Sequence, residues 1–146
     1  MYFEDYTVGD QYSILPFSLS EQEIIEFAEK YDARPFHLNQ EAAEKTRFGK
    51  IIASGLHTIC AAWGHWVERV IHEDHLVAGL SIESAKWLAP VYADERITGT
   101  IEVSHKRLFS SGKAGAITWR MLLKNEGGEA VLEYIVTGMV EARPGD

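Results

Sequence analysis

The sequence has a single cysteine and no long apolar run. With Cys60 alone, no disulfide can form within the chain, and a lone thiol fits a reducing compartment. The first ten residues are acidic and mixed, unlike a secretory signal peptide. No apolar run approaches the roughly eighteen residues that a membrane-spanning helix needs. We therefore expect a cytoplasmic protein that does not act in a membrane.

Positive charge is also scarce. Lysine and arginine total 14 against 22 acidic residues, which gives a net charge of −8. This balance argues against a general nucleic-acid binder, which needs a basic surface. It leaves room for an anionic ligand, because a local cluster of donors can outweigh the overall sign. The length of 146 residues and the 46% hydrophobic content predict one ordinary globular domain.

The first half of the chain is typical of helices. Ser20 and Glu23 form a capping-box pattern, and the apolar spacing after it predicts a helix that ends at Asp32. Asn39 is a suitable cap for a second, short helix that runs to about Arg47.

Gly55 opens the longest helical pattern, about eighteen residues or roughly 27 Å. Its apolar residues fall at helical steps: Leu56, Ile59, Cys60, Trp63, Val67, Val70 and Ile71. We expect this helix to be central, with Cys60 as a small core residue.

The remaining segments alternate in polarity, as strands do. The first is Tyr12–Phe17, and the others span about residues 79–88, 97–103, 117–123 and 131–140. The Asn125–Gly128 segment predicts a hairpin turn, and Gly138 a bulge or a point of close approach. Four consecutive strands joined by short turns predict an antiparallel meander. Helices followed by such a sheet indicate an α+β fold, with four or five strands around the long helix.

One short stretch combines an acid with an imidazole. Asp32 and His37 are separated by Pro35, which disfavours a helical conformation at the preceding residue, so we expect a turned loop. A carboxylate and an imidazole held by such a loop can bind one water, which suits general acid–base chemistry. Each residue also has a structural interpretation, since Asp is a common turn former and His37 could cap the helix at Asn39.

Several segments together resemble a known family. They are Asp32-Ala-Arg-Pro-Phe-His37, Phe48-Gly49, Ile52-Ala-Ser-Gly55 and Trp87-Leu-Ala-Pro-Val-Tyr-Ala-Asp94. In order and spacing they are similar to the MaoC-like dehydratases, also called R-specific enoyl-CoA hydratases, over nearly the whole chain. The resemblance implies one hotdog domain over residues 1–146, in which about five strands wrap around one long central helix.

The resemblance also implies a reaction, the reversible addition of water to a trans-2-enoyl-CoA. Asp32 and His37 would be catalytic, and the N–H of Gly55 would stabilise the enolate. Two residues depart from the family: Arg34 stands where Asn is usual, and Ser54 where His is frequent. We assign both, with Gly55, to substrate binding. Arg34 could recognise a carboxylate or phosphate, although a solvated arginine is the commoner case, and Ser54 could instead cap the long helix.

No cofactor is implied beyond the thioester, which CoA or an acyl carrier protein would supply. His72 and His75 have a spacing found in metal sites, but no third ligand lies near them, so we expect no metal. Hotdog proteins form dimers with the site at the interface. We therefore expect a homodimer or higher homo-oligomer, with no nucleic acid and no membrane as partner.

Two other functions remain open. A hotdog thioesterase would place an acid on the central helix near the thioester, and Glu68 is the one acid inside that helix before its end. A non-catalytic acyl-CoA-binding protein would hold its ligand without turnover and would not need Asp32.

Overall fold

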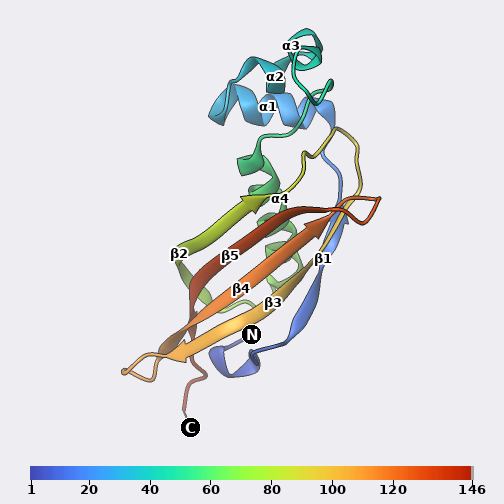
Figure 1. The fold of residues 1–146 in the computed structure, drawn as a ribbon. Helices are drawn as coiled ribbons and strands as arrows, with labels where there is room; N and C mark the ends of the chain where they lie inside the picture. Colours follow the sequence, from blue (N-terminus) through green and yellow to red (C-terminus); the bar gives the residue numbers. More distant parts are fainter. Residues whose placement is uncertain (146) are drawn as a thin grey trace.

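The computed structural model describes residues 1–145 and contains one curved, five-stranded antiparallel sheet with a long helix on its inner face (Figure 1). The α+β class and the central helix are therefore confirmed. The elements are η1 (Phe3–Asp5), β1 (Gln11–Phe17), α1 (Glu21–Tyr31), α2 (Pro35–Leu38), α3 (Gln40–Glu44), α4 (Gly55–Val70), β2 (Leu76–Trp87), β3 (Ile97–Leu108), β4 (Ala114–Lys124) and β5 (Ala130–Glu141). Within residues 1–145, no helix is long and apolar enough to cross a membrane.

The predicted helix caps are present. Ser20 Oγ accepts a hydrogen bond from the N–H of Glu23 at 3.1 Å, and the Glu23 carboxylate accepts one from the N–H of Ser20 at 3.3 Å. Asn39 Oδ1 caps α3 by accepting from the N–H of Ala42 at 2.8 Å. α3 ends at Glu44, before the predicted end near Arg47, and Gly49 then turns the chain with a φ of 71°.

The predicted four-strand meander is wrong. The strand order is β1-β3-β4-β5-β2, so only β3, β4 and β5 follow one another as hairpins. β2 crosses to the far side and pairs with β5, while β1 pairs with β3. The reason lies in residues 88–96, which form no tight turn. They pass along the segment before α4, where Ile52 pairs with Tyr92 and the N–H of Ala53 donates to the carbonyl of Val91 at 2.9 Å.

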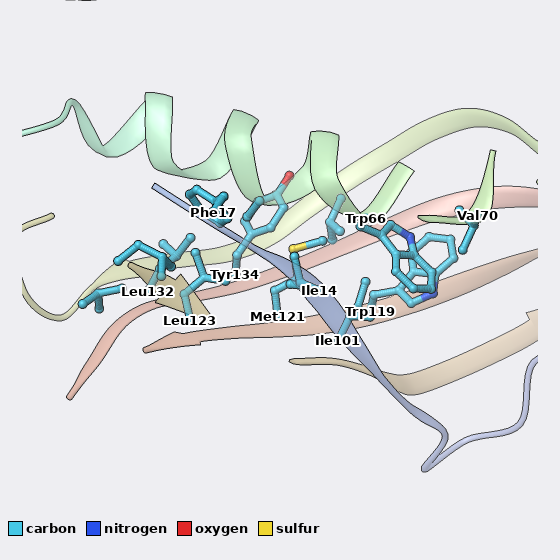
Figure 2. Packing of buried hydrophobic residues seen from close by; sticks show 14 of the residues in the cluster. Ile14, Phe17, Trp66, Val70, Ile101, Trp119, Met121, Leu123, Leu132 and Tyr134 are labelled. Atoms are coloured by element: carbon cyan, nitrogen blue, oxygen red, sulfur yellow. The ribbon is translucent and has the colours of Figure 1, made fainter. Parts of the chain in front are cut away.

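The core lies between α4 and the inner face of the sheet (Figure 2). α4 buries Thr58, Ala62, Trp66 and Val70, which repeat every four residues on one side of the helix. The sheet meets them with fully buried side chains such as Trp119. The close approach predicted at Gly138 is confirmed: a Cβ there would lie 2.7 Å from the Leu76 side chain and 3.1 Å from that of Trp119.

The predicted apolar stripe of α4 is only partly buried. Leu56 and Ile71 are about half exposed, at 51% and 53%, and Cys60 is exposed, so its assignment to the core is wrong. The stripe is wider than the side of α4 that this sheet covers. One apolar face of the helix therefore points away from the chain's own core.

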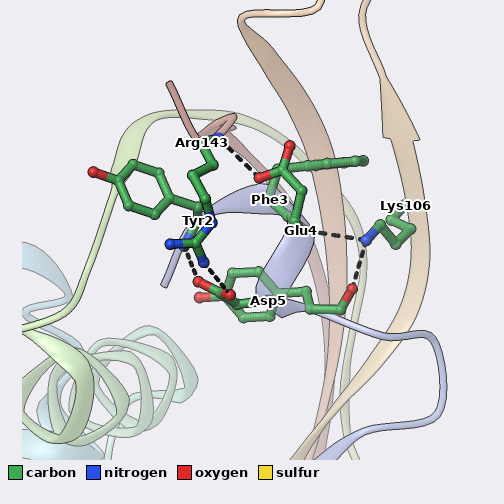
Figure 3. Close-up of polar contacts among 7 residues, drawn as sticks. Tyr2, Phe3, Glu4, Asp5, Lys106 and Arg143 are labelled. Carbon is green, nitrogen blue, oxygen red and sulfur yellow. Dashed lines mark hydrogen bonds and ion pairs between the residues drawn. The ribbon is translucent and has the colours of Figure 1, made fainter. Parts of the chain in front are cut away.

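The two termini are fastened to each other at the end of the sheet away from α1 (Figures 1 and 3). Lys106 Nζ donates to the backbone carbonyls of Phe3 at 3.0 Å and Tyr6 at 2.5 Å. The backbone N–H of Arg143 donates to the Glu4 carboxylate at 2.8 Å. These bonds hold η1 against β3 and leave the opposite end of the sheet to the helices that carry the acid and the imidazole.

Candidate active site

Asp32 and His37 lie at the end of the sheet where α4 begins. Asp32 is the C-cap of α1, and its N–H donates to the carbonyl of Ala28 at 2.8 Å. The loop predicted between the two residues contains a short helix: Pro35 opens the single turn of α2, which carries His37. Proline is well tolerated at a first helical position, because the N–H it lacks would have no partner in the helix. The turn brings the two side chains together as expected.

The imidazole of His37 is held in one orientation. The residue is 5% exposed, and Nδ1 lies 2.6 Å from the carbonyl oxygen of Ile52. A carbonyl can only accept, so this bond requires the proton on Nδ1. Neutral His37 then presents an unprotonated Nε2, which lies 3.5 Å from Asp32 Oδ2. Because the segment of Ile52 is itself paired with residues 91 and 92, the acceptor that fixes the ring is part of the folded framework.

The carboxylate of Asp32 has three polar neighbours. Ser54 Oγ donates to Oδ2 at 2.8 Å, and the guanidinium Nε of Arg34 lies 3.2 Å from Oδ1. His37 is the third. Ser54 occupies the N-cap position of α4, but its side chain makes no capping bond, contrary to the simpler interpretation. The buried hydroxyl is used to orient the carboxylate.

Asp32, His37, Ser54 and Gly55 open onto one cavity of about 380 Å³. Its wall is mostly apolar and comes from four segments of the chain. The remaining lining residues are Arg47, Phe48, Ile52, Ala53, Leu56, Thr58, Trp87, Leu88, Ala89, Pro90, Val91 and Val131.

The N-terminus of α4 also faces this cavity. The first backbone bond of the helix runs from Thr58 to Ser54, so the N–H groups of Gly55, Leu56 and His57 have no acceptor within the helix. The positive end of the helix dipole adds to these donors. The cavity thus combines an acid, an imidazole and a site suited to a negative oxygen.

Gly55 makes room for an indole ring. A Cβ at this position would lie 2.2 Å from Trp87 Nε1 and 2.4 Å from Cε2. Trp87 therefore packs directly over the backbone of Gly55, although 51% of its surface is exposed. From the sequence alone we expected this glycine to allow the approach of a substrate carbonyl, and its contact with Trp87 was not predicted.

The structure places Arg34 at the rim of the site. Its side chain is 70% exposed and contacts Asp32, and it is not among the cavity-lining residues. Arg47 does line the cavity, although the sequence marked it only as a helix end. Thr58 follows Arg47 by eleven residues, whereas Trp87 lies on β2, on the other side of α4 in sequence. The spacing of residues in the sequence could not have placed Trp87 beside the other two without knowledge of the fold.

A family comparison agrees with this arrangement. The model of the MaoC like domain matches residues 5–124. The chain belongs to the MaoC-like family. The Bacillus subtilis protein YdeM is 30% identical over 107 residues, which cover 73% of this chain and 76% of that protein.

Solved structures share the fold of this MaoC-like protein. A monoamine oxidase regulatory protein from Archaeoglobus fulgidus superposes with a TM-score of 0.89 at 32% identity, covering 99% of this chain and 96% of the other. A MaoC-like dehydratase from Rhodospirillum rubrum gives 0.86 at 24% identity, with 99% of each chain covered. R-hydratase PhaJ1 from Pseudomonas aeruginosa gives 0.74 at 19%, covering 97% and 86%. The hotdog fold is thereby confirmed, and family membership supports the addition or removal of water as its chemistry.

Proposed function

We propose that this protein is an acyl-thioester hydratase that adds water reversibly to a trans-2-enoyl-CoA. The observation that carries the proposal is the pair formed by His37 Nε2 and Asp32 Oδ2, 3.5 Å apart at the wall of the cavity. Both atoms accept hydrogen bonds when the imidazole is neutral and the carboxylate ionised. One water molecule can donate a hydrogen to each, and its lone pair then points into the cavity.

The proposed reaction uses this geometry as follows. The water oxygen bonds to the β-carbon of the enoyl group, and its proton passes to His37 Nε2. The electron pair of the double bond moves toward the thioester oxygen as an enolate. When the enolate collapses, the protonated His37 Nε2 gives this proton to the α-carbon, so one hydrogen of the water is on the new hydroxyl and the other is on the α-carbon. Asp32 orients the water and stabilises the imidazolium, while Ser54 fixes the carboxylate in place.

The enolate oxygen needs a donor, and the start of α4 supplies one. The N–H of Gly55 has no hydrogen-bond acceptor within α4, and Gly55 lines the cavity. We therefore propose that this N–H donates a hydrogen bond to the thioester carbonyl oxygen. Arg34 acts on Asp32 Oδ1 in this scheme, outside the cavity. The substrate brings the only further group required, the acyl thioester of CoA or of a carrier protein.

A thioesterase has less support in this site. Glu68, the acid on α4 that it would use, is 67% exposed, pairs with His65 at 3.5 Å and does not line the cavity. A non-catalytic acyl-CoA-binding protein would not need a carboxylate and an imidazole nitrogen positioned to bind the same water molecule.

The test is to follow the enoyl-thioester absorbance of crotonyl-CoA with purified protein. Asp32→Asn and His37→Ala should each lower the rate by roughly 10²- to 10⁴-fold, the range for a positioned acid or base. His105→Ala, on an exposed histidine of β3, is the matched control and should retain full activity. Release of free thiol would indicate a thioesterase. Equal activity in wild type and both site variants would refute the assignment.

We also propose that two copies pair through α4 and β2. The two sheet edges differ: β1 is short and contains Pro16, whereas β2 has twelve residues and an open edge. Along β2, Val77, Leu80 and Ile82 are 52%, 48% and 62% exposed, beside the uncovered apolar face of α4. A second copy is a suitable cover because its own edge and helix are equally apolar.

The test of pairing is sedimentation of the wild type against Ile82→Glu. The wild type should sediment as a homodimer or larger, and the variant as a monomer with an unchanged circular dichroism spectrum. Thr100→Glu, on the opposite half of the sheet, serves as a control for added charge. A wild type that is monomeric at high concentration would contradict the proposal.

A further inference from the structure

The cavity contains one charge that the proposed reaction does not use. Arg47 lines it, and its guanidinium carbon lies 4.9 Å from the ring centre of Phe48. Within residues 1–145 no carboxylate lies within 4.0 Å of this guanidinium. Three other arginines have such a partner. The described arginines that also lack one do not line the cavity: Arg69, Arg96 and Arg107. Arg47 is thus an exposed cation on an apolar cavity wall, packed against an aromatic ring and without a counter-ion among residues 1–145.

Asp32, the carboxylate that lines the cavity, does not form an ion pair with Arg47. The Asp32 carboxylate is already bonded by Ser54 and paired with Arg34 on its other oxygen. The chain as a whole carries a net charge of −8, which repels an anionic ligand at long range. A ligand with a negative group therefore needs a local cation at the cavity, and Arg47 is placed to supply it.

We propose that Arg47 is an anion-binding residue of this cavity and receives a negatively charged group of the bound thioester. The inference rests on the proposed function only for the class of ligand. Guanidinium chemistry suits both carboxylate and phosphate, because its planar fork can give two parallel hydrogen bonds to either. The anion can therefore be a carboxylate at the far end of the acyl group or a phosphate of the CoA carrier.

Calorimetric binding of three saturated thioesters tests the inference without turnover. Butyryl-CoA carries phosphates, glutaryl-N-acetylcysteamine carries only a carboxylate, and butyryl-N-acetylcysteamine carries neither. Arg47→Gln should weaken one of the two anionic ligands by roughly tenfold, the loss expected for a charge-assisted bond at an accessible site. The neutral thioester should bind equally to both proteins. Loss for butyryl-CoA alone assigns a phosphate, and loss for the glutaryl compound alone assigns a carboxylate.

Lys50→Gln is the matched control. Lys50 is a nearby exposed cation that lies 5.6 Å from the Tyr92 ring and does not line the cavity, so its removal should change none of the three affinities. Equal weakening of the neutral thioester by Arg47→Gln would overturn the inference, as would unchanged binding of all three or a wild type that binds none. Failure of the hydratase proposal is seen separately, as absence of crotonyl-CoA hydration by a wild type that binds these analogues.

Discussion

Replacing Gly55 separates two explanations of why glycine stands at the start of α4. In the structure, a methyl group at this position would collide with the Trp87 indole, with contacts of 2.2, 2.4 and 2.7 Å. Overpacking of this kind destabilises a protein by about 1–3 kcal/mol. Because half of the Trp87 surface is exposed, the indole has room to move, and we expect Gly55→Ala to fall near the lower end of that range.

The clash depends on one partner, so a double-mutant cycle with Trp87→Ala isolates it. Without the indole, alanine at position 55 should be neutral or mildly stabilising. The reason is that the helix propensity of alanine is more favourable than that of glycine by up to about 1 kcal/mol. The two substitutions together should therefore cost about 1–2 kcal/mol less than the sum of their separate effects. Urea unfolding of the four proteins gives this value. If Gly55→Ala destabilises equally in both backgrounds, the packing argument is refuted.

The same four proteins report on catalysis. If the acyl carbonyl must approach the Gly55 backbone closely, the double variant will regain stability but stay slow in hydration of crotonyl-CoA. If the glycine serves only the indole, the double variant will hydrate as fast as Trp87→Ala. The unfolding free energies and the hydration rates of the four proteins together distinguish a structural role of Gly55 from a role in catalysis.

Two further predictions concern parts of the fold outside the cavity. Gly138→Ala should destabilise by about 1–3 kcal/mol in urea unfolding, since its Cβ would meet Leu76 at 2.7 Å; Gly127→Ala, with its nearest contact at 3.4 Å, should have a much smaller effect. His57 stacks on Phe27 with ring centres 4.4 Å apart, and burial lowers its pKa from 6.5 against an opposing effect of Glu23. The unfolded chain then binds the proton more readily, so unfolding free energy should fall as the pH drops through about 6.5, and less so in His57→Phe. Equal pH slopes in the two proteins would contradict this.

Local chemistry made the helices predictable. The Ser20 and Glu23 capping box and the Asn39 cap depend on groups within a few residues, and both form with the expected bonds. The alternation of residues 117–123 likewise depends on the two faces of one strand, and all four inward residues are buried. The Asp32 and His37 pair was predicted because both side chains lie on one short segment.

Long-range pairing was not predictable in the same way. Adjacent strands in sequence usually pair, so β2 was expected beside β3, but the connection after Trp87 instead runs along the segment that leads into α4. That crossing places Trp87 over Gly55 and Pro90 in the cavity wall. The wall of the site is thus set by topology, while its acid and imidazole are set by local sequence.

The error at Cys60 has a different origin. The apolar periodicity of a helix predicts which residues are buried. It does not indicate whether the same chain or a partner chain covers them. On α4 the residues that face the sheet repeat as Thr58, Ala62, Trp66 and Val70, while Leu56 and Cys60 lie on another side and are exposed. The proposed pairing of two copies accounts for both apolar sides: the chain's own sheet covers one, and the partner covers the other. The apolar stripe of α4 is then wide because two surfaces cover it, one from the same chain and one from the partner. Leu56 lies on the side that the partner would cover and also lines the cavity, so the proposed dimer contact would adjoin the active site.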